Sequence, residues 1–190
     1  MSRGLGDVYK RQVIDSGTLQ KKDILISNDI IQKVSSEINV EADRTFDCSG
    51  LHIIPGVIDD QVHFREPGLT HKGDIYSESK AAVAGGITSF MEMPNTFPQT
   101  LTQDLLKKKF LLGEKKSLAN FSFFMGASND NINEVLLCDP KKVGAIKIFM
   151  GSSTGNMLVN KLDTLNELFK KSRILLAVSY THLRAHETPV

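Results

Sequence analysis

Short apolar runs separated by segments of helical periodicity extend through most of this chain. The runs at residues 87–93, 120–126 and 144–150 have the length and composition of buried strands, and a further run begins at 174–177. The segments between them carry apolar residues at the spacing of one helix face. This alternation predicts parallel βα units, which occur both in closed barrels and in doubly wound sheets.

Capping and breaking residues mark the expected helix boundaries. Asp74 is placed to cap a helix over residues 75–84, which Gly85 ends. Thr100 and Gln103 have the spacing of a capping box and predict the start of the next helix. A later helix is expected to bury one apolar face, formed by Leu158, Leu162, Leu165 and Phe169.

The N-terminal part of the chain has a different pattern. Its β-prone runs are short and separated by polar links; they are residues 23–27, 30–34 and 45–47. Residues 13–53 therefore predict a small β unit, and residues 54–177 carry the βα units. Residues 1–12 and 178–190 do not continue the pattern beside them and are left out of the predicted fold.

Four polar residues at alternate positions follow the apolar run at residues 53–58. They are Asp59, Gln61, His63 and Arg65. Alternate positions of a strand share one face, and a face with these polar groups cannot lie unpaired in an apolar core. The apolar run before them favours a central parallel strand that is buried on both faces. The spacing alone leaves two interpretations open, a solvated edge strand and a metal or ligand site.

Lys147 and Asn95 are two further candidates for chemistry. Lys147 lies in the aliphatic run 145–150, where a buried cation is costly. Either its ammonium reaches the strand end while its stem packs, or the lysine takes part in a reaction. Asn95 follows a proline after an apolar strand, and by itself it also fits an ordinary turn.

Composition narrows the class of protein. The chain has 190 residues, 41% hydrophobic and 24% charged, with a net charge of +1, which is typical of a soluble globular protein. This charge does not favour nucleic acid or a membrane surface as a partner. Cys48 and Cys138 lie in unrelated contexts without the spacing of a metal or redox motif, so the cytoplasm is the expected compartment.

The stretch from Pro55 to Gly68 resembles the first barrel strand of the cyclic amidohydrolases. Its ending, Arg65-Glu66-Pro67-Gly68, is similar to that of the dihydroorotases in particular, and Lys147-Ile148-Phe149-Met150 is similar to the fourth strand of the family. The resemblance implies an α/β fold, about the first half of a TIM (β/α)8 barrel preceded by part of a small β-sandwich. It also implies dihydroorotase activity, the interconversion of N-carbamoyl-aspartate and dihydroorotate in pyrimidine biosynthesis.

The resemblance assigns roles to the residues at the strand ends. It implies that His63 binds a metal ion and that Arg65 and Asn95 hold the carboxylate of the substrate. Gln61 stands where the family has another metal-binding histidine, although an amide oxygen is a poorer zinc ligand than imidazole. Asp59 is implied to be a metal ligand or a residue just outside the ligand shell.

The family lysine on the fourth strand reacts with carbon dioxide, and its carbamate bridges two zinc ions; by position it is Lys147. The family's general base, an aspartate, has no counterpart in these 190 residues. No catalytic base is therefore assigned, and the chain alone is expected to be inactive. The loop at residues 152–155 is a candidate pocket wall, whereas His182 and His186 lie in the C-terminal tail and are not taken as ligands.

Residues 1–12 and 178–190 resemble translated sequencing-adapter sequence, which predicts that the chain is an internal piece of a longer protein. Two alternatives to a dihydroorotase stay open. One is a hydantoinase or allantoinase relative, against which Arg65 argues. The other is a non-catalytic dihydroorotase-like subunit with a protein partner, which Gln61 keeps open. The expected partner is otherwise a small-molecule substrate, and a homo-oligomeric parent is compatible with the resemblance.

Overall fold

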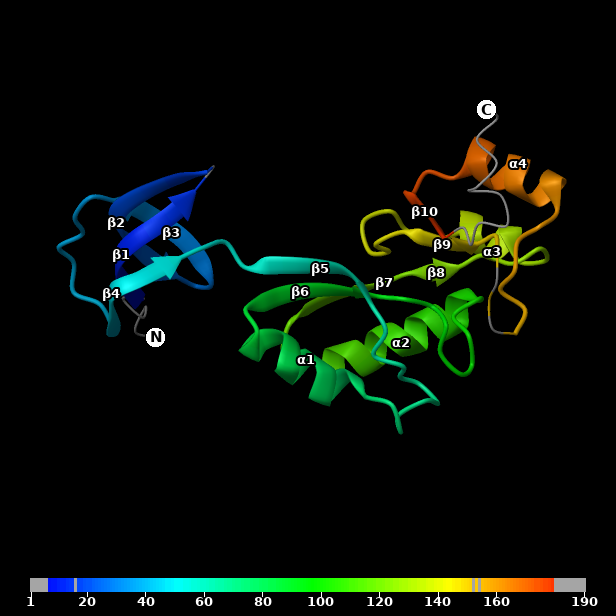
Figure 1. The fold of residues 1–190 in the computed structure, drawn as a ribbon, viewed down its shortest axis with the longest axis horizontal. Helices are drawn as coiled ribbons and strands as arrows, with labels where there is room; N and C mark the ends of the chain where they lie inside the picture. Colours follow the sequence, from blue (N-terminus) through cyan, green and yellow to red (C-terminus); the bar gives the residue numbers. More distant parts are fainter. Residues whose placement is uncertain (1–6, 16, 152, 154, 180–190) are drawn as a thin grey trace, which may run out of the picture. The chain divides into compact units, whose positions relative to one another are not determined.

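The computed structural model describes residues 7–15, 17–151, 153 and 155–179. It divides into two compact units, Met1–Gly56 and Val57–Val190, here termed the N-terminal unit and the βα unit. In Figure 1 the first runs from blue to cyan and the second from cyan to red.

A single four-stranded sheet forms the N-terminal unit, with the strand order β3-β2-β1-β4 (Figure 1). Its strands are β1 (Asp7–Asp15), β2 (Thr18–Ser27), β3 (Ile30–Ser35) and β4 (Arg44–Ile53). β2 pairs antiparallel with β1 and β3, whereas β1 and β4 are parallel. Asn28 and Asp29 have φ angles of 51° and 61°, so they form the tight turn between β2 and β3 to which these residue types are suited.

β1 lies partly in a segment that the sequence analysis left out of the fold. Residues 7–12 pair with both β2 and β4, and they join these two strands into one sheet. Their polar composition hid the strand from a search for alternating apolar residues. The likeness of this segment to adapter sequence stays a prediction about its origin, which strand pairing does not test.

Parallel strands follow one another in the βα unit in their order along the chain. One sheet contains β5 (Val57–Val62), β6 (Ile87–Glu92) and β7 (Asn120–Phe123), and the next contains β8 (Met125–Gly126), β9 (Ile146–Phe149) and β10 (Leu176–Ser179). Between β7 and β8 the N–H of Phe124 donates to Glu92 O at 3.0 Å. A doubly wound sheet reverses its strand order, and these strands do not, so the barrel-type order is confirmed.

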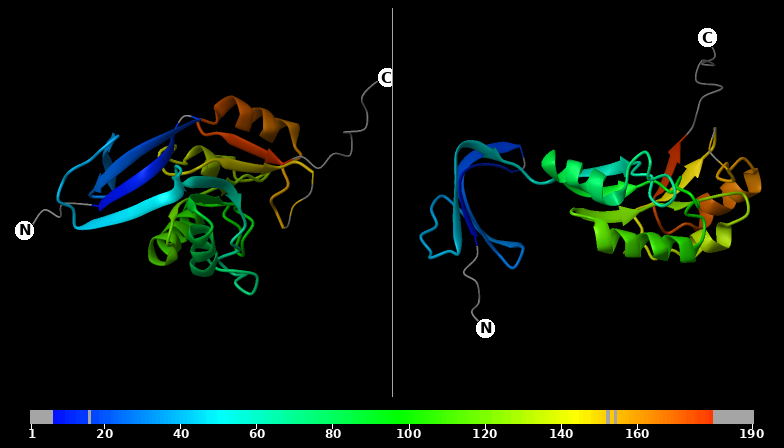
Figure 2. Two further views of the ribbon diagram at one scale, coloured as in Figure 1. Left: turned by 60° about the vertical axis from the view of Figure 1, so that its left-hand side comes forward. Right: turned by 90° about the horizontal axis from the view of Figure 1, so that it is seen from below.

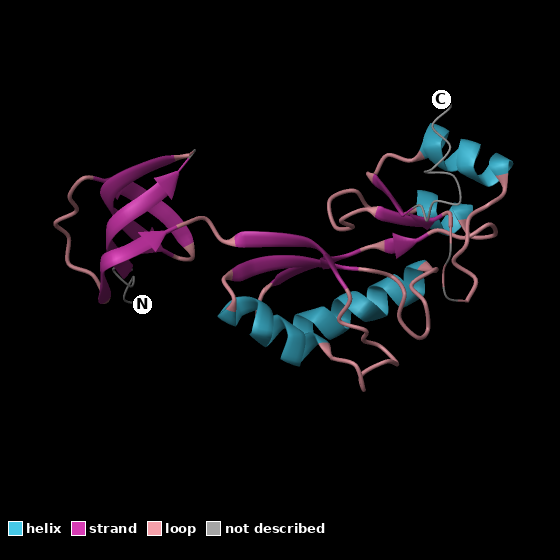
Figure 3. Ribbon diagram, in the orientation of Figure 1, coloured by secondary structure: helices cyan, strands magenta, loops and turns pink. Residues whose placement is uncertain are grey.

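Helices connect these strands. They are α1 (Ile75–Ala84), α2 (Gln103–Lys116), α3 (Ile132–Leu136) and α4 (Leu162–Lys171). Figure 3 shows α1 and α2 along one side of the sheet of β5, β6 and β7, and Figure 2 shows both helices from two further directions. Asp74 caps α1 as predicted, accepting from Ser77 N at 2.8 Å, and Gly85 follows its last turn. Within the described ranges, no helix is long and apolar enough to cross a bilayer.

The predicted capping box of α2 is wrong. The N-cap is Thr102, whose Oγ1 accepts from Leu105 N at 3.2 Å. Thr100 lies buried in the loop before the helix, and the Gln103 side chain donates to Glu134 O instead of closing a box. Thr100 has the spacing of a capping box with Gln103, whereas the residue three positions after Thr102 is Leu105, so the box pattern pointed to the wrong threonine.

α4 buries a face other than the predicted one. Leu158 lies before the helix, and Leu162 and Phe169 are 75% and 58% exposed. The buried apolar residues are Leu165 and Leu168, an i, i+3 pair. Only one member of the predicted face therefore packs against the core.

Aromatic rings form a continuous cluster in the core of the βα unit. Phe64, Phe90, Phe121, Phe123 and Phe110 each contact the next ring in this order, with centroids 4.5 to 6.3 Å apart. Such a pair contributes about 0.5–1.5 kcal/mol beyond the burial of its surface. Because the rings come from β6, β7, α2 and the segment after β5, the cluster holds the helix against the sheet.

Replacing Thr102 with alanine is expected to lower the free energy of unfolding by about 1 kcal/mol, the usual cost of losing a threonine N-cap. The reason is that the Leu105 N–H loses its acceptor. Thr102→Ser keeps a hydroxyl at this position and should retain most of the stability. Urea unfolding followed by circular dichroism measures both variants, and equal midpoints for alanine and wild type would speak against the cap.

Candidate active site

The candidate residues lie at or near the ends of the parallel strands. His63 and Arg65 follow β5, Asn95 follows β6, and Lys147 lies within β9. Parallel strands present their carboxyl ends at one edge, where the active sites of barrels are found. The positive charges of Arg65 and Lys147 both lower the pKa of His63, so His63 feels a charge from a strand distant in sequence.

A hydrogen bond joins His63 to Asn95. Nδ1 of His63 lies 2.9 Å from Oδ1 of Asn95. Because a carbonyl oxygen can only accept, Nδ1 donates, and Nε2 keeps the lone pair with which imidazole binds a metal. The Nδ2 group of Asn95 is a donor that this bond does not use.

The surroundings of His63 favour its neutral form. Partial desolvation of the ring lowers the pKa of His63, the bond to Asn95 opposes this, and the positive charges of Arg65, Lys147 and Lys109 lower it further. A metal ligand must be unprotonated, so this environment suits a ligand better than a general acid.

Lys147 is buried, and within the described ranges no carboxylate forms an ion pair with it. The residue is 4% exposed, its Nζ lies 5.1 Å from the ring centroid of Phe149, and burial lowers the pKa of Lys147. Lys109 is also buried, but its Nζ lies 2.9 Å from a carboxylate oxygen of Glu92. Lys147 is therefore the better source of the neutral amine that carbamate formation needs.

The backbone of Arg65 adopts the left-handed region, with φ of 70°. For a residue with a Cβ this conformation costs about 1–2 kcal/mol, so surrounding contacts must hold it. The N–H of Arg65 donates to Oε1 of Glu92 at 2.9 Å, and its carbonyl accepts from Leu69 N at 3.1 Å.

The sequence analysis missed the buried pair of Glu92 and Lys109 beside these residues. Burial raises the pKa of Glu92 and lowers the pKa of Lys109, and each charge opposes the shift of the other. The available signal was the position of Lys109 on the same face of α2 as Leu106 and Gly113, which are also buried. A run of three lysines, 107–109, concealed it, because such a run is typical of a solvated face.

Glu66 stabilises the fold around the site. It is 5% exposed, its Oε2 accepts from Ile75 N at the start of α1 at 2.9 Å, and its Oε1 forms an ion pair with Lys116 of α2. Gly68 has φ of 82°, and a Cβ there would lie 1.8 Å from a carbonyl oxygen of the loop after β6. Within the motif Arg65-Glu66-Pro67-Gly68, Glu66 and Gly68 therefore serve the fold.

β5 differs from the expected central strand. It is an edge of its sheet among the described residues, and Val57 and Ile58 are 46% and 62% exposed. Asp59 pairs with Phe90 and Val62 pairs with Glu92, so β5 has one residue more than β6 in this stretch. Such a bulge interrupts strict alternation, so the four polar residues do not share one regular strand face.

Gln61 and Asp59 contact each other. Within the described part of the chain, no hydrogen bond joins either of them to His63, Arg65, Asn95 or Lys147. The N–H of Gln61 donates to Oδ1 of Asp59 at 3.1 Å, and Gln61 is exposed. Ser152 and Thr154 of the proposed pocket wall, and the tail residues His182 and His186, lie outside the described residues.

Among the candidate residues, two can supply donors that suit zinc well. They are Nε2 of His63 and a carbamate formed on the amine of Lys147. Groups of three or more His, Cys, Asp or Glu side chains that could hold a metal do not occur among the residues that the structure describes. The assignments of His63, Lys147, Gln61 and Asp59 as ligands stay predictions.

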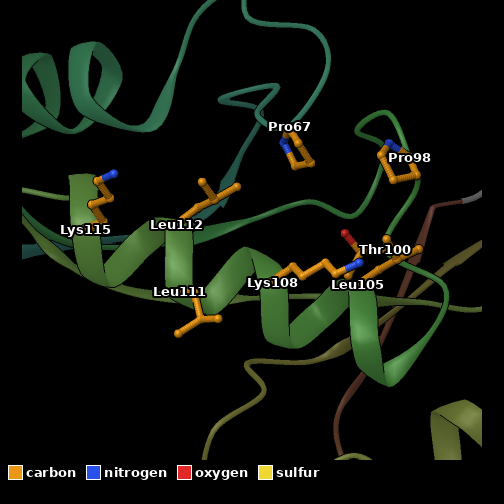
Figure 4. A pocket seen from close by; sticks show the side chains of 8 residues that line it. All are labelled: Pro67, Pro98, Thr100, Leu105, Lys108, Leu111, Leu112 and Lys115. Atoms are coloured by element: carbon orange, nitrogen blue, oxygen red, sulfur yellow. The ribbon is translucent and has the colours of Figure 1, made fainter.

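A cavity of about 530 Å³ lies on another part of the βα unit, between α2 and the loops after β5 and β6 (Figure 4). It is lined by Pro67, Pro98, Thr100, Leu105, Lys108, Leu111, Leu112 and Lys115. None of the candidate residues lines it, so this cavity is separate from the candidate site.

Comparison with known proteins finds allantoinases, dihydroorotases and hydantoinases. An allantoinase of Deinococcus radiodurans is 40% identical over 137 residues, 70% of this chain and 30% of that protein. A dihydroorotase of Methanosarcina acetivorans is 34% identical over 178 residues, 92% of this chain and 38% of that protein. No family model matches the chain.

Among solved structures, the L-hydantoinase of Arthrobacter aurescens superposes with a TM-score of 0.85 at 28% identity. The match covers 92% of this chain and 40% of that protein. The chain thus spans two fifths or less of the length of these three relatives. Sequence and fold together show that the chain belongs to the cyclic amidohydrolases, the hydrolases that include dihydroorotases, allantoinases and hydantoinases.

Proposed function

We propose that a longer protein containing this chain is a zinc-dependent dihydroorotase of cytoplasmic pyrimidine biosynthesis. The observation that carries the proposal is the hydrogen bond between His63 and Asn95, which follow two neighbouring parallel strands, and the positive charges of Arg65 and Lys147 that act on His63 support it. An imidazole and a buried amine suit a metal, and a guanidinium and an amide suit a carboxylate. Dihydroorotate has the two matching groups, a cyclic amide and a ring carboxylate.

In this proposal Arg65 and Asn95 bind and orient the substrate. A guanidinium can donate two parallel hydrogen bonds to a carboxylate. Nδ2 of Asn95 can add another, while its Oδ1 stays on His63. Fixing the carboxylate places the ring amide, and such orientation is a major source of rate acceleration.

His63 and the carbamate of Lys147 would hold zinc, with two ions per site expected. When bound, the metal polarises the amide carbonyl and lowers the pKa of a bound water. His63 offers its neutral Nε2, and the aliphatic surroundings of Lys147 favour the uncharged amine that reacts with carbon dioxide. The general base is proposed to come from a part of the protein that this chain does not contain.

Allantoinase activity is the second candidate, favoured by the 40% identity with the allantoinase of Deinococcus radiodurans. Allantoin has a cyclic amide but no carboxylate. A positively charged Arg65 beside the site therefore favours dihydroorotate over allantoin.

The test is hydrolysis of dihydroorotate, allantoin and hydantoin by a longer protein that contains this chain, before and after metal removal. Zinc-restored turnover of dihydroorotate above the other two is the expected result. Preference for allantoin would replace the proposal by the second candidate. A folded protein that binds no zinc and hydrolyses none of the three would instead favour a non-catalytic subunit, the role that Gln61 keeps open.

A further inference from the structure

The segments that carry Arg65 and Asn95 are both bound to one buried pair of charges. Oε1 of Glu92 accepts from Arg65 N at 2.9 Å, and Oε2 lies 2.9 Å from Nζ of Lys109. The same Nζ donates to Met93 O at 2.8 Å, two residues before Asn95. Glu92 and Lys109 are 0% and 1% exposed, so water does not compete for these contacts.

We propose that Glu92 and Lys109 are positioning residues that set the backbones of Arg65 and Asn95 as one carboxylate-binding pair. The inference rests on the proposed function, because it assumes that these two side chains hold a substrate carboxylate. It extends that function by adding two residues that do not themselves reach the ligand and that determine which class of cyclic amide binds.

The left-handed backbone of Arg65 is the first argument. With φ of 70°, this residue adopts a conformation that a side chain disfavours. The carboxylate of Glu92 accepts its N–H, and an acceptor with a full charge makes the stronger kind of hydrogen bond. Backbone strain that is held by buried contacts is a common feature of ligand sites.

The second argument is that a buried ion pair is a poor way to attach α2 to the sheet. Two desolvated charges often stabilise a fold no better than apolar residues of similar size. α2 already packs through Leu106 and the ring contacts of Phe110 with Phe121 and Phe123. The groups that use the charges are the backbone N–H of Arg65, which Glu92 accepts, and the backbone carbonyl of Met93, to which Lys109 donates.

Two double variants separate positioning from stability. Glu92→Met with Lys109→Met fills the space without charge, so the fold should survive, but it leaves Arg65 N and Met93 O without these partners. Glu92→Gln with Lys109→Met returns an amide oxygen to Arg65 N. Lys161→Met is the control, because it removes a lysine from the exposed pair with Asp130.

In the longer zinc-loaded protein, the first double variant is expected to raise KM for dihydroorotate by about tenfold or more, the effect of losing a charged hydrogen bond. kcat and the slower hydrolysis of dihydrouracil, the same ring without the carboxylate, should change little. The second double variant should recover much of the KM, and Lys161→Met should match wild type. The inference would be overturned if the first double variant lost activity equally on dihydroorotate and dihydrouracil, or if its KM for dihydroorotate were unchanged.

Hydrogen exchange gives a readout that does not depend on catalysis. The Arg65 amide should exchange faster in the first double variant than in wild type, and the second double variant should protect it again, because its glutamine side chain supplies an acceptor. If the wild-type protein hydrolyses neither dihydroorotate nor dihydrouracil, the proposed function fails. The exchange rates still decide whether Glu92 and Lys109 position the backbone. Unchanged exchange in the first variant would refute that role whatever the activity.

Discussion

Replacing Lys147 with alanine is expected to lower kcat/KM for dihydroorotate by about a thousandfold or more, because several kcal/mol of metal-derived stabilisation is lost. The expectation concerns the longer protein that contains this chain. Lys147 is buried, and in the described residues it lacks the carboxylate that accompanies Lys109. A side chain without an amine cannot form the carbamate, so bound zinc should fall together with activity.

Three measurements make this expectation specific. Lys142→Ala changes an exposed lysine of the same segment and should leave activity and zinc content as in wild type. A short carboxylic acid added to Lys147→Ala can occupy the vacated space and supply a carboxylate, so partial recovery is expected. Thermal melts check that the variant is folded. Full activity and full zinc content in folded Lys147→Ala would exclude the carbamate.

Replacing Arg65 with methionine is expected to lower kcat/KM for dihydroorotate by about a hundredfold, within the range measured when one partner of a charged pair is removed. The loss should lie mainly in KM, since the guanidinium is proposed to hold the carboxylate and not the reacting amide. Hydrolysis of dihydrouracil should stay unchanged. The backbone should be unaffected, because methionine keeps a Cβ at φ of 70° and the N–H to Glu92 remains.

Arg173→Met is the matched control, because Arg173 is exposed in the loop before β10 and takes no part in the candidate site. Arg65→Lys should bind dihydroorotate more tightly than Arg65→Met but less tightly than wild type, since an ammonium lacks the planar fork of a guanidinium. If Arg65→Met weakens both rings equally, the arginine does not select the carboxylate. Hydantoinase-like or allantoinase-like specificity would then be the better account.

The order of strands and helices could be predicted from the sequence because apolar runs and helix breakers are local signals. Asp74 and Gly85 mark the ends of α1 in both the sequence and the structure. The N-cap of α2 could not be predicted in the same way, since the capping-box spacing lies at Thr100 and Gln103, whereas the path of the loop places Thr102 at the cap. The buried face of α4 depends likewise on neighbours that are distant in sequence.

The sequence could predict only those site residues that belong to a recognisable motif and also lie near the end of a predicted strand. His63 and Asn95 were each assigned a role, and their hydrogen bond joins two segments that periodicity cannot relate. Glu92 and Lys109 lay outside the prediction for a physical reason. Charged residues are assumed to face solvent, and only the three-dimensional structure shows that these two neutralise each other in the interior.

The chain of phenylalanine rings in the βα unit has a spectroscopic consequence. The protein has ten phenylalanines and no tryptophan, and Phe46 is the sole phenylalanine of residues 1–56. Packed rings in a fixed asymmetric setting give sharp near-ultraviolet circular dichroism bands that vanish when side-chain packing is lost. Those phenylalanine bands therefore monitor the βα unit almost alone. A single tryptophan introduced into the N-terminal sheet would report on the other unit, because the chain has no tryptophan of its own.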